Sequence, residues 1–206
     1  MTRPTILAFQ STVWQHYNEK GRHDLPWRQP EQDGSFDPYK ILVSELMLQQ
    51  TQVSRVIPKF ATFIKAYPSF EALAVAPLSE VLRMWSGLGY NRRAKFLLQT
   101  AQLVTGQYSG HLPNRHADLV ALPGVGHNTA GAIRAYAFNE PAVFVETNIR
   151  TVFIHHFFGH GDKVSDAVLL PLIQESTPVA DVRGWYWALM DYGTHLKQTV
   201  GNVSQA

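Results

Sequence analysis

Two acidic residues in this 206-residue chain occupy positions where a carboxylate is unusual. Glu45 lies in "SELMLQQTQV", among leucines and a methionine and just before three glutamines. Glu146 lies in "FVETNIRTVF", where an apolar run meets a predicted helix. A protonated carboxyl and an ionised carboxylate together can cleave a glycosidic bond, because one protonates the leaving group and the other stabilises the oxocarbenium-like sugar. The two residues are therefore a candidate catalytic pair.

Each acid also has an ordinary interpretation. Glu45 could face solvent, although Leu46, Met47 and Leu48 leave little polar surface around it. Glu146 could interact with the dipole of the following helix, for which Thr147 or Asn148 is the expected N-cap. The spacing of the two acids along the chain does not show that they meet.

Two glycine-containing segments are candidates for contact with a polyanion. In "GLGYNRRAK", a tight turn would project Tyr90 beside Arg92, Arg93 and Lys95, which suits base stacking and phosphate neutralisation. In "LPGVGHNTAGAI" (122–133), two glycines precede a helix of small residues whose first amides favour an anion. The alternatives are a solvated basic helix face and a helix corner that binds nothing.

Composition limits the remaining chemistry. Apolar residues make up 45% of the chain, which predicts a folded core, and the formal charge of +2 permits a polyanion partner without requiring one. The absence of cysteine excludes disulfides, a thiolate nucleophile and Cys-ligated metals or clusters. His155, His156 and His160 suggest a metal site only weakly, and ordinary histidines are favoured. With no long apolar run and no signal peptide, a soluble intracellular protein is expected.

Hydrophobic periodicity is helical along most of the chain, so the predicted fold is all-α. The segment 142–146 is the one candidate strand. Prolines are expected between helices or at their starts. Helices are predicted over residues 5–18, 39–53, 58–66, 69–74, 79–85, 91–108, 115–121, 127–138, 148–157, 166–176 and 180–196.

Taken together, four motifs resemble the helix-hairpin-helix DNA glycosylases, and most closely their MutY-type adenine branch. They are "LPWR…DPYK..VSELMLQQTQV..VIP.F", "WSGLGY..RA", "LPGVG..TAGAI" and "VETNIR.VF", in the family's order and spacing. The resemblance covers the chain from about Phe9 to His195. It implies a two-lobed fold with a DNA-binding cleft between the lobes. A six-helix domain would span residues 30–139, and residues 1–29 with 140–206 would form the second domain.

The resemblance also implies roles for individual residues. Glu45 would enter the base pocket as general acid, and Glu146 would face the developing cation on the sugar. Gln50 and Tyr90 would wedge into the DNA stack from opposite sides. The base pocket would include Trp27, Arg28, Asn128 and Trp187. The DNA backbone would be held by Leu122, Gly124, Val125, Gly126, Thr129 and Arg92, with a monovalent cation, K⁺ or Na⁺, at the backbone of residues 122–126.

Several positions depart from the family pattern. The acid after the hairpin is usually Asp, whereas Glu146 is one methylene longer. Asn128 replaces the lysine nucleophile of bifunctional relatives, so no Schiff base forms there. Lys197 stands where the first cysteine of an iron–sulfur loop would fall, so neither the cluster nor the 8-oxoguanine-reading domain is expected. Trp187 replaces an acid or amide that often touches adenine.

The expected function is therefore a monofunctional DNA glycosylase of base excision repair, acting on adenine mispaired with 8-oxoguanine or guanine in double-stranded DNA. The alternatives are a thymine or uracil glycosylase acting on mismatches with guanine, and a non-catalytic helix-hairpin-helix DNA-binding module. A monomer without membrane association is expected. Its location would be cytoplasmic, or nucleoid-associated in a prokaryote.

Overall fold

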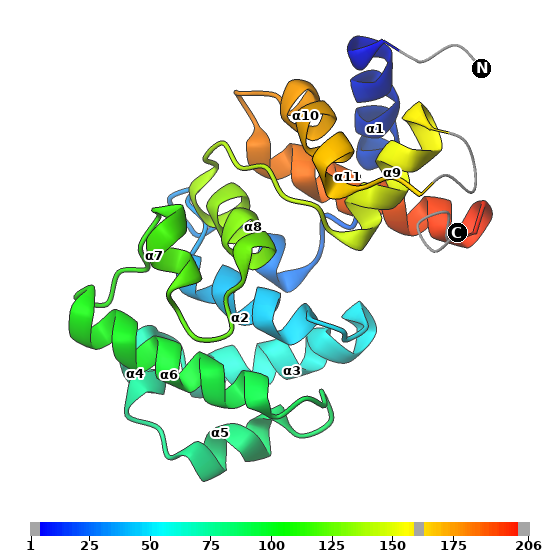
Figure 1. Cartoon of the computed structure of the whole chain (residues 1–206). Helices are drawn as coiled ribbons and strands as arrows, with labels where there is room; N and C mark the ends of the chain where they lie inside the picture. Colours follow the sequence, from blue (N-terminus) through cyan, green and yellow to red (C-terminus); the bar gives the residue numbers. More distant parts are fainter. Residues whose placement is uncertain (1–4, 159–162, 202–206) are drawn as a thin grey trace. The chain divides into compact units, whose positions relative to one another are not determined.

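The structure is a computed structural model that describes residues 5–158 and 163–201, and over those residues the predicted all-α fold is confirmed. Figure 1 shows the helices in chain order. They are α1 (Ile6–Lys20), the 3₁₀ helix η1 (Pro26–Arg28), α2 (Pro38–Leu48), α3 (Val53–Ala66), α4 (Phe70–Ala74), α5 (Leu78–Trp85), α6 (Arg92–Gln107), α7 (His116–Val120), α8 (His127–Phe138), α9 (Thr147–Phe157), α10 (Asp166–Ser176) and α11 (Val182–Thr199). None of these described helices has the length and apolar character needed to cross a membrane.

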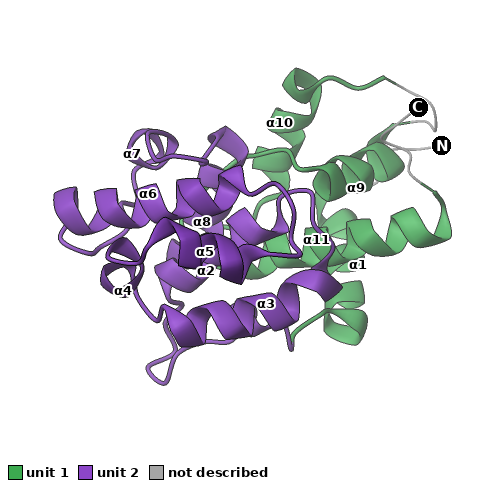
Figure 2. Ribbon diagram, turned by 90° about the horizontal axis from the view of Figure 1, so that it is seen from below, with its two compact units in different colours: residues 1–23, 139–206 green, residues 24–138 purple. Residues whose placement is uncertain are grey.

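The chain forms two compact units, which Figure 2 colours separately. Unit 2 is the continuous stretch 24–138, and unit 1 combines residues 1–23 with residues 139–206. The boundaries lie at residues 24 and 139 rather than at the expected 30 and 140. Residues 24–29 belong to unit 2 because Trp27 packs edge-to-face on Phe60 of α3, with ring centroids 5.4 Å apart.

The central helix of unit 2 is α2. Asp37 caps its N-terminus by accepting a hydrogen bond from the Tyr39 amide at 2.8 Å, and Pro38 occupies the first helical position. Apolar side chains on every face of α2 are buried, including Ile41, Leu42, Leu46 and Met47. A helix buried on all sides fits its neighbours rigidly, which fixes the direction of any polar side chain it carries.

The break between α2 and α3 corrects two predicted helices. α2 ends at Leu48 and α3 begins at Val53, so residues 49–52 are not helical and residues 53–57 are. Pro58 lies inside α3 rather than at its start. Its ring is exposed, where water can satisfy the carbonyl that loses its helical partner.

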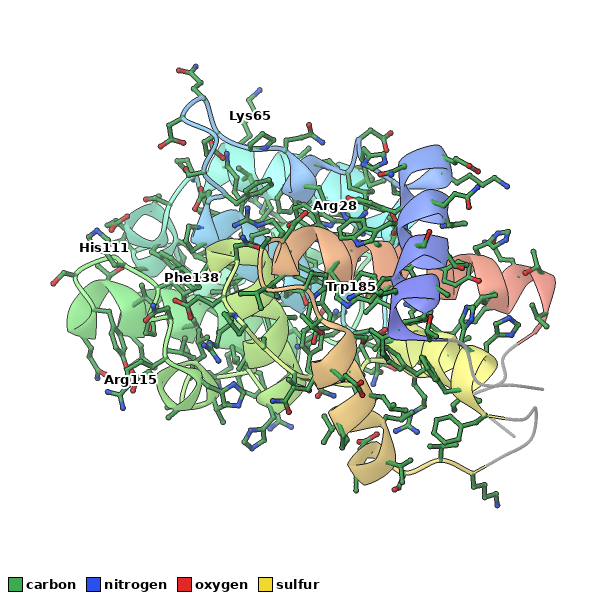
Figure 3. All side chains as sticks on the ribbon, turned by 90° about the horizontal axis from the view of Figure 1, so that it is seen from above. Arg28, Lys65, His111, Arg115, Phe138 and Trp185 are labelled. Atoms are coloured by element: carbon green, nitrogen blue, oxygen red, sulfur yellow. The ribbon has the colours of Figure 1, made fainter. Side chains whose placement is uncertain are left out.

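The core of unit 1 is aromatic. Phe9 of α1 meets Phe153 and Phe157 of α9 at ring-centroid distances of 5.1 and 5.0 Å, and Trp185 of α11 at 5.8 Å. Trp185, labelled in Figure 3, is fully buried. Asp191 is also buried and accepts hydrogen bonds from the backbone and the guanidinium of Arg22. This ion pair fixes the segment after α1 to α11.

The candidate strand at 142–146 is not a strand. Tyr186 of α11 donates a hydrogen bond from its hydroxyl to the carbonyl of Ala142 at 2.7 Å, and its ring stacks on Phe144 at 4.3 Å. Ala142, Phe144 and Val145 are buried while Val143 is exposed, and the Ala142 carbonyl is satisfied by a side chain rather than by a neighbouring strand.

Candidate active site and nucleic-acid interface

The turn after α2 presents Gln50 to solvent. Gln50 is exposed and has a φ of 53°, in the left-handed region that residues other than glycine rarely occupy. The carbonyls at the C-terminus of α2 have no amide donor within the helix. Arg93 of α6 donates hydrogen bonds to them instead. Its Nη1 donates to the carbonyls of Leu46 and Met47 at 2.8 and 2.9 Å, and also to the carbonyl of Gln49.

A second exposed turn, 87–90, is held by the same guanidinium. Arg93 Nη2 donates to the carbonyls of Leu88 and Gly89, both at 3.1 Å. Tyr90 has a φ of 49° and a side chain that is 64% exposed. Thr51 lies between the two turns, because its hydroxyl accepts from Arg93 at 3.0 Å and has the carbonyls of Gln49, at 3.2 Å, and Leu88, at 3.3 Å, as alternative acceptors for its one hydrogen. One buried cation therefore holds both candidate wedges, Gln50 and Tyr90.

This position of Arg93 differs from the expected surface cation. Arg93 is only 6% exposed, whereas Arg92 lies in solvent, and burial lowers the pKa of Arg93 from its ordinary value. Arg92 lies over the ring of Phe96 at 4.8 Å and remains available for a phosphate. The carbonyls of a glycine turn need hydrogen-bond donors. The arginines that follow the turn could therefore have been predicted to donate to it, and Arg93 is the one that does.

The hairpin at 122–126 is a tight turn that is hydrogen-bonded to the turn after α2. Gly124 has a φ of 80°, and a Cβ built there would lie 3.0 Å from Phe96, so glycine is required both by conformation and by space. The Gly124 carbonyl accepts from Gln49 Nε2 at 3.3 Å, and the Pro123 carbonyl accepts from the Thr100 hydroxyl at 3.0 Å. Gly126, in contrast, has no positive φ and nothing within 4 Å of a built Cβ.

The hairpin leads directly into α8, where the predicted and observed bounds agree. The first amides of α8 lack helical acceptors, and its first turn carries no acid, so this end favours an anion. Asn128 is exposed there, and Thr129 Oγ1 accepts from Gln49 Nε2 at 3.4 Å. The side chains of Leu122 and Val125 are buried, so these two residues offer only backbone atoms to a partner.

His127 at the start of α8 was not singled out from the sequence. Its Nδ1 lies 3.1 Å from Nε2 of the half-buried His116, and the two rings stack with centroids 5.4 Å apart. Burial and the charge of His127 lower the pKa of His116. Neither histidine belongs to a larger metal-binding group within the residues that the structure describes.

In unit 2, Glu45 is the half-buried acid of an otherwise buried stretch of α2. Its chain neighbours Ser44 and Leu46 are completely buried. Trp27 and Arg28 of η1 are buried in the same unit, and Figure 3 labels Arg28. Their place in the base pocket stays a prediction.

In unit 1, Glu146 is itself the N-cap of α9, so the expected cap at Thr147 or Asn148 is wrong. Its Oε2 accepts a hydrogen bond from the Asn148 amide at 2.7 Å. The longer Glu side chain bends back to its own helix, which fixes one carboxylate oxygen and leaves the other for a different interaction. Trp187 is buried in α11.

The histidines of α9 have structural surroundings. His156 lies 3.1 Å from the Tyr192 hydroxyl, and burial, assisted by the charge of His155, lowers its pKa to about 4. His160 lies outside the described residues. The described residues contain no group of three or more side chains suited to hold a metal ion.

Comparison with known proteins identifies relatives for nearly all of the chain. The model of the "HhH-GPD superfamily base excision DNA repair protein" family matches residues 43–171. The adenine DNA glycosylase of Buchnera aphidicola subsp. Baizongia pistaciae is 37% identical over 190 residues, which are 92% of this chain and 53% of the relative. That of Mycolicibacterium smegmatis is 38% identical over 160 residues, 78% of this chain and 53% of the relative. The chain thus spans about half the length of these relatives.

A solved structure extends the comparison. A thermostable thymine-DNA glycosylase superposes with a TM-score of 0.81 at 30% sequence identity, and the match covers 91% of this chain and 85% of that one. The sequence relatives and this structure carry different target bases in their names.

Proposed function

Since the chain belongs to the HhH-GPD superfamily of base excision DNA repair proteins, we propose that it is a monofunctional DNA glycosylase. Its proposed substrate is adenine mispaired with 8-oxoguanine or guanine in double-stranded DNA. Relatives named adenine DNA glycosylase, at 37% and 38% identity, support this choice of base. The enzyme would extrude the adenine from the duplex and hydrolyse its N-glycosidic bond.

The observation that carries the proposal is the pair of exposed turns joined by Arg93. Extruding a base costs a few kcal/mol of lost stacking and pairing, so the protein must fill the gap in the DNA with rigid groups. Gln50 and Tyr90 both have left-handed backbone conformations, and Arg93 donates hydrogen bonds to both of their turns. A strained backbone that is held in place by surrounding hydrogen bonds is typical of a functional site.

The two carboxyl groups would divide the chemistry. Adenine leaves as an anion unless a ring nitrogen is protonated, and Glu45, surrounded by buried apolar residues, is the proposed proton donor. Glu146 would place a carboxylate beside the oxocarbenium-like sugar. One oxygen of Glu146 already accepts from Asn148, so the carboxylate is held in one orientation before substrate arrives.

The proposed reaction is hydrolysis without strand cleavage. A lyase step requires a lysine amine that forms a Schiff base with the sugar, and Asn128 occupies the corresponding position after the hairpin. An amide cannot form that bond. Borohydride treatment of the protein with abasic-site DNA would therefore leave no covalent adduct.

The hairpin and the start of α8 would hold a phosphate of the DNA backbone. The exposed first amides of α8 and the cation of Arg92 are suited to this contact. A monovalent cation at residues 122–126 is also part of the proposal, because carbonyl oxygens are hard ligands. The Pro123 and Gly124 carbonyls already accept one hydrogen bond each and keep a second lone pair for such an ion.

The second candidate function is removal of thymine opposite guanine. The superposition on a thymine-DNA glycosylase at 30% identity favours it, as does Trp187 in place of a polar group. Gln49 and Gln50 favour adenine, by their resemblance to the adenine branch.

The test is single-turnover base release from two duplexes, one with adenine opposite 8-oxoguanine and one with thymine opposite guanine. Alkali reveals the abasic sites. We expect release from the first duplex, with no strand break before alkali. Release from the second duplex alone would establish the thymine function instead. Binding of both duplexes without release from either would leave only a DNA-binding module.

A further inference from the structure

One face of α11 lies against the first turn of α9. Met190, Gly193 and Lys197 follow one another at the spacing that places residues on a single helix face. Each of the three meets the same residue, Asn148 of α9. All four residues belong to unit 1.

Asn148 is held from three directions. Lys197 Nζ donates to Asn148 Oδ1 at 2.8 Å, and Asn148 Nδ2 lies 4.0 Å from the sulfur of Met190. At Gly193 the two helices touch through backbone, since a Cβ built there would lie 2.4 Å from the Asn148 carbonyl oxygen. No larger residue fits at position 193 without moving the start of α9.

Asn148 in turn holds Glu146. Its backbone amide donates to Glu146 Oε2 at 2.7 Å, so only one residue separates the Lys197 ammonium from that carboxylate. Glu146 is also the charged group that acts on Lys197. Partial burial lowers the pKa of Lys197, and the negative charge of Glu146 opposes this effect.

A partly buried lysine requires a reason, because withdrawing an ammonium from water costs free energy. The aromatic contacts that α11 makes with α1 and α9, such as Trp185 against Phe9, do not involve Lys197. The ammonium is instead directed at the residue that fixes Glu146. Its contribution is therefore to the orientation of a carboxylate.

We propose that Lys197 is a positioning residue, which holds Glu146 in its reactive orientation through Asn148. This inference rests on the proposed glycosylase function, in which Glu146 faces the sugar. Lys197 itself touches neither the base nor the sugar. Its charge-assisted hydrogen bond holds Asn148 in place. The backbone amide of Asn148, which donates to Glu146, is thereby held as well.

The test compares Lys197→Met, which removes the charge but keeps an unbranched chain, with Lys197→Arg, which keeps the charge. Lys163→Met is the matched control, since it removes one cation from an exposed position of the same unit. We expect Lys197→Met to lower the single-turnover rate of base release by roughly ten- to a hundredfold. Lys197→Arg should retain most of the rate. All three variants should bind the duplex alike.

The pH profile separates this role from a purely structural one. Because Lys197 loses its proton at lower pH than an exposed lysine and Arg keeps its own, the rate of Lys197→Arg divided by that of the parent protein should rise in the alkaline range. The ratio cancels every ionisation that the two proteins share. An unchanged or faster rate in Lys197→Met, or a flat ratio, would overturn the proposal.

A second measurement does not depend on activity. The side-chain amide signals of Asn148, observed by NMR in ¹⁵N-labelled protein, should move in Lys197→Met and stay near their parent positions in Lys197→Arg. If they do not move in Lys197→Met, the contact is absent in solution and the proposal fails. If they move as expected but no duplex releases a base in the parent protein, the glycosylase function fails while the link between Lys197 and Asn148 stands.

Discussion

At the scale of single residues, Glu45 and Glu146 obtain their proposed roles from different surroundings. Glu45, the proposed proton donor, is a half-buried acid within a buried apolar helix. Glu146 is a helix cap, hydrogen-bonded as a carboxylate through one of its oxygens. The proposed roles, proton donor for Glu45 and carboxylate beside the sugar for Glu146, match these two surroundings.

The role of Glu45 leads to a direct prediction. In Glu45→Gln the side chain keeps its shape but cannot donate a proton as a carboxyl can, so base release should fall by roughly a hundredfold or more, with duplex binding preserved. The rate is measured under single turnover and the affinity by fluorescence anisotropy. Glu80→Gln, at an exposed position of α5, should match the parent protein. Full activity in Glu45→Gln would refute the assignment of the general acid.

At the scale of elements, regular helices were predictable and the break after α2 was not. The small residues after a double-glycine turn predict α8 with its observed bounds. Residues 49–52, in contrast, contain neither glycine nor proline, and helical periodicity continues through them. They are not helical because Arg93, far along the chain, donates hydrogen bonds to the carbonyls at the end of α2. A local pattern does not contain this tertiary contact.

The same limit applies to the candidate site. The exposed Tyr90 follows from the glycines that precede it, but Arg92, Arg93 and Lys95 form a run of cations in which the sequence does not distinguish the buried member. Only the folded chain separates Arg93, inside the two turns, from Arg92 on the surface.

Removing Arg93 should therefore damage both turns at once. In Arg93→Met, buried carbonyls on the two turns lose their donors at a cost of about 1–3 kcal/mol each, so the thermal midpoint should fall by several degrees or more. Amides at 49–51 and 88–90 should exchange faster with deuterated water. Arg92→Met is the matched control and should change stability by less than about 0.5 kcal/mol. Equal behaviour of the two variants would show that the turns do not depend on Arg93.

The hairpin offers a second test at this scale. Gly124→Ala places a Cβ on a left-handed residue and against Phe96, so it should lower the free energy of unfolding by about 1–2 kcal/mol. Gly126→Ala, two positions further on, meets nothing and should leave stability nearly unchanged. Urea unfolding of the two variants measures the difference. Equal losses would mean that the geometry of the turn is not what Gly124 provides.

At the scale of the whole molecule, the two units differ in what stabilises them. Unit 2 is organised around a buried helix and a buried arginine, whereas unit 1 depends on an aromatic core, the Arg22–Asp191 ion pair and a histidine-rich region. His156 lies in that region, beside Phe9, Tyr192 and His155. Acid should therefore weaken unit 1 through His16 and His156, because burial lowers the pKa of both.

The sign follows from the lowered pKa of His156. Its value in the folded protein is about 4 against an ordinary 6.5, so between these pH values the unfolded chain binds more protons. The associated stability is present above about pH 6.5 and is lost as pH falls toward 4, by at most about 1.4 kcal/mol per pH unit before solvent screening. In urea unfolding across this range, His156→Gln should show a shallower decline than the parent protein. The exposed His111→Gln should not, and a decline unchanged in His156→Gln would assign it to other groups.

The division of the chain between the units also has a consequence during synthesis. Unit 2 is continuous, so all of its residues emerge from the ribosome before those of α9 to α11. α1 is made first, yet the partners of Phe9 on α9 and α11 are made last. While unit 2 is free to fold, the apolar face of α1 stays uncovered, so the nascent chain exposes an aggregation-prone helix until translation is nearly complete.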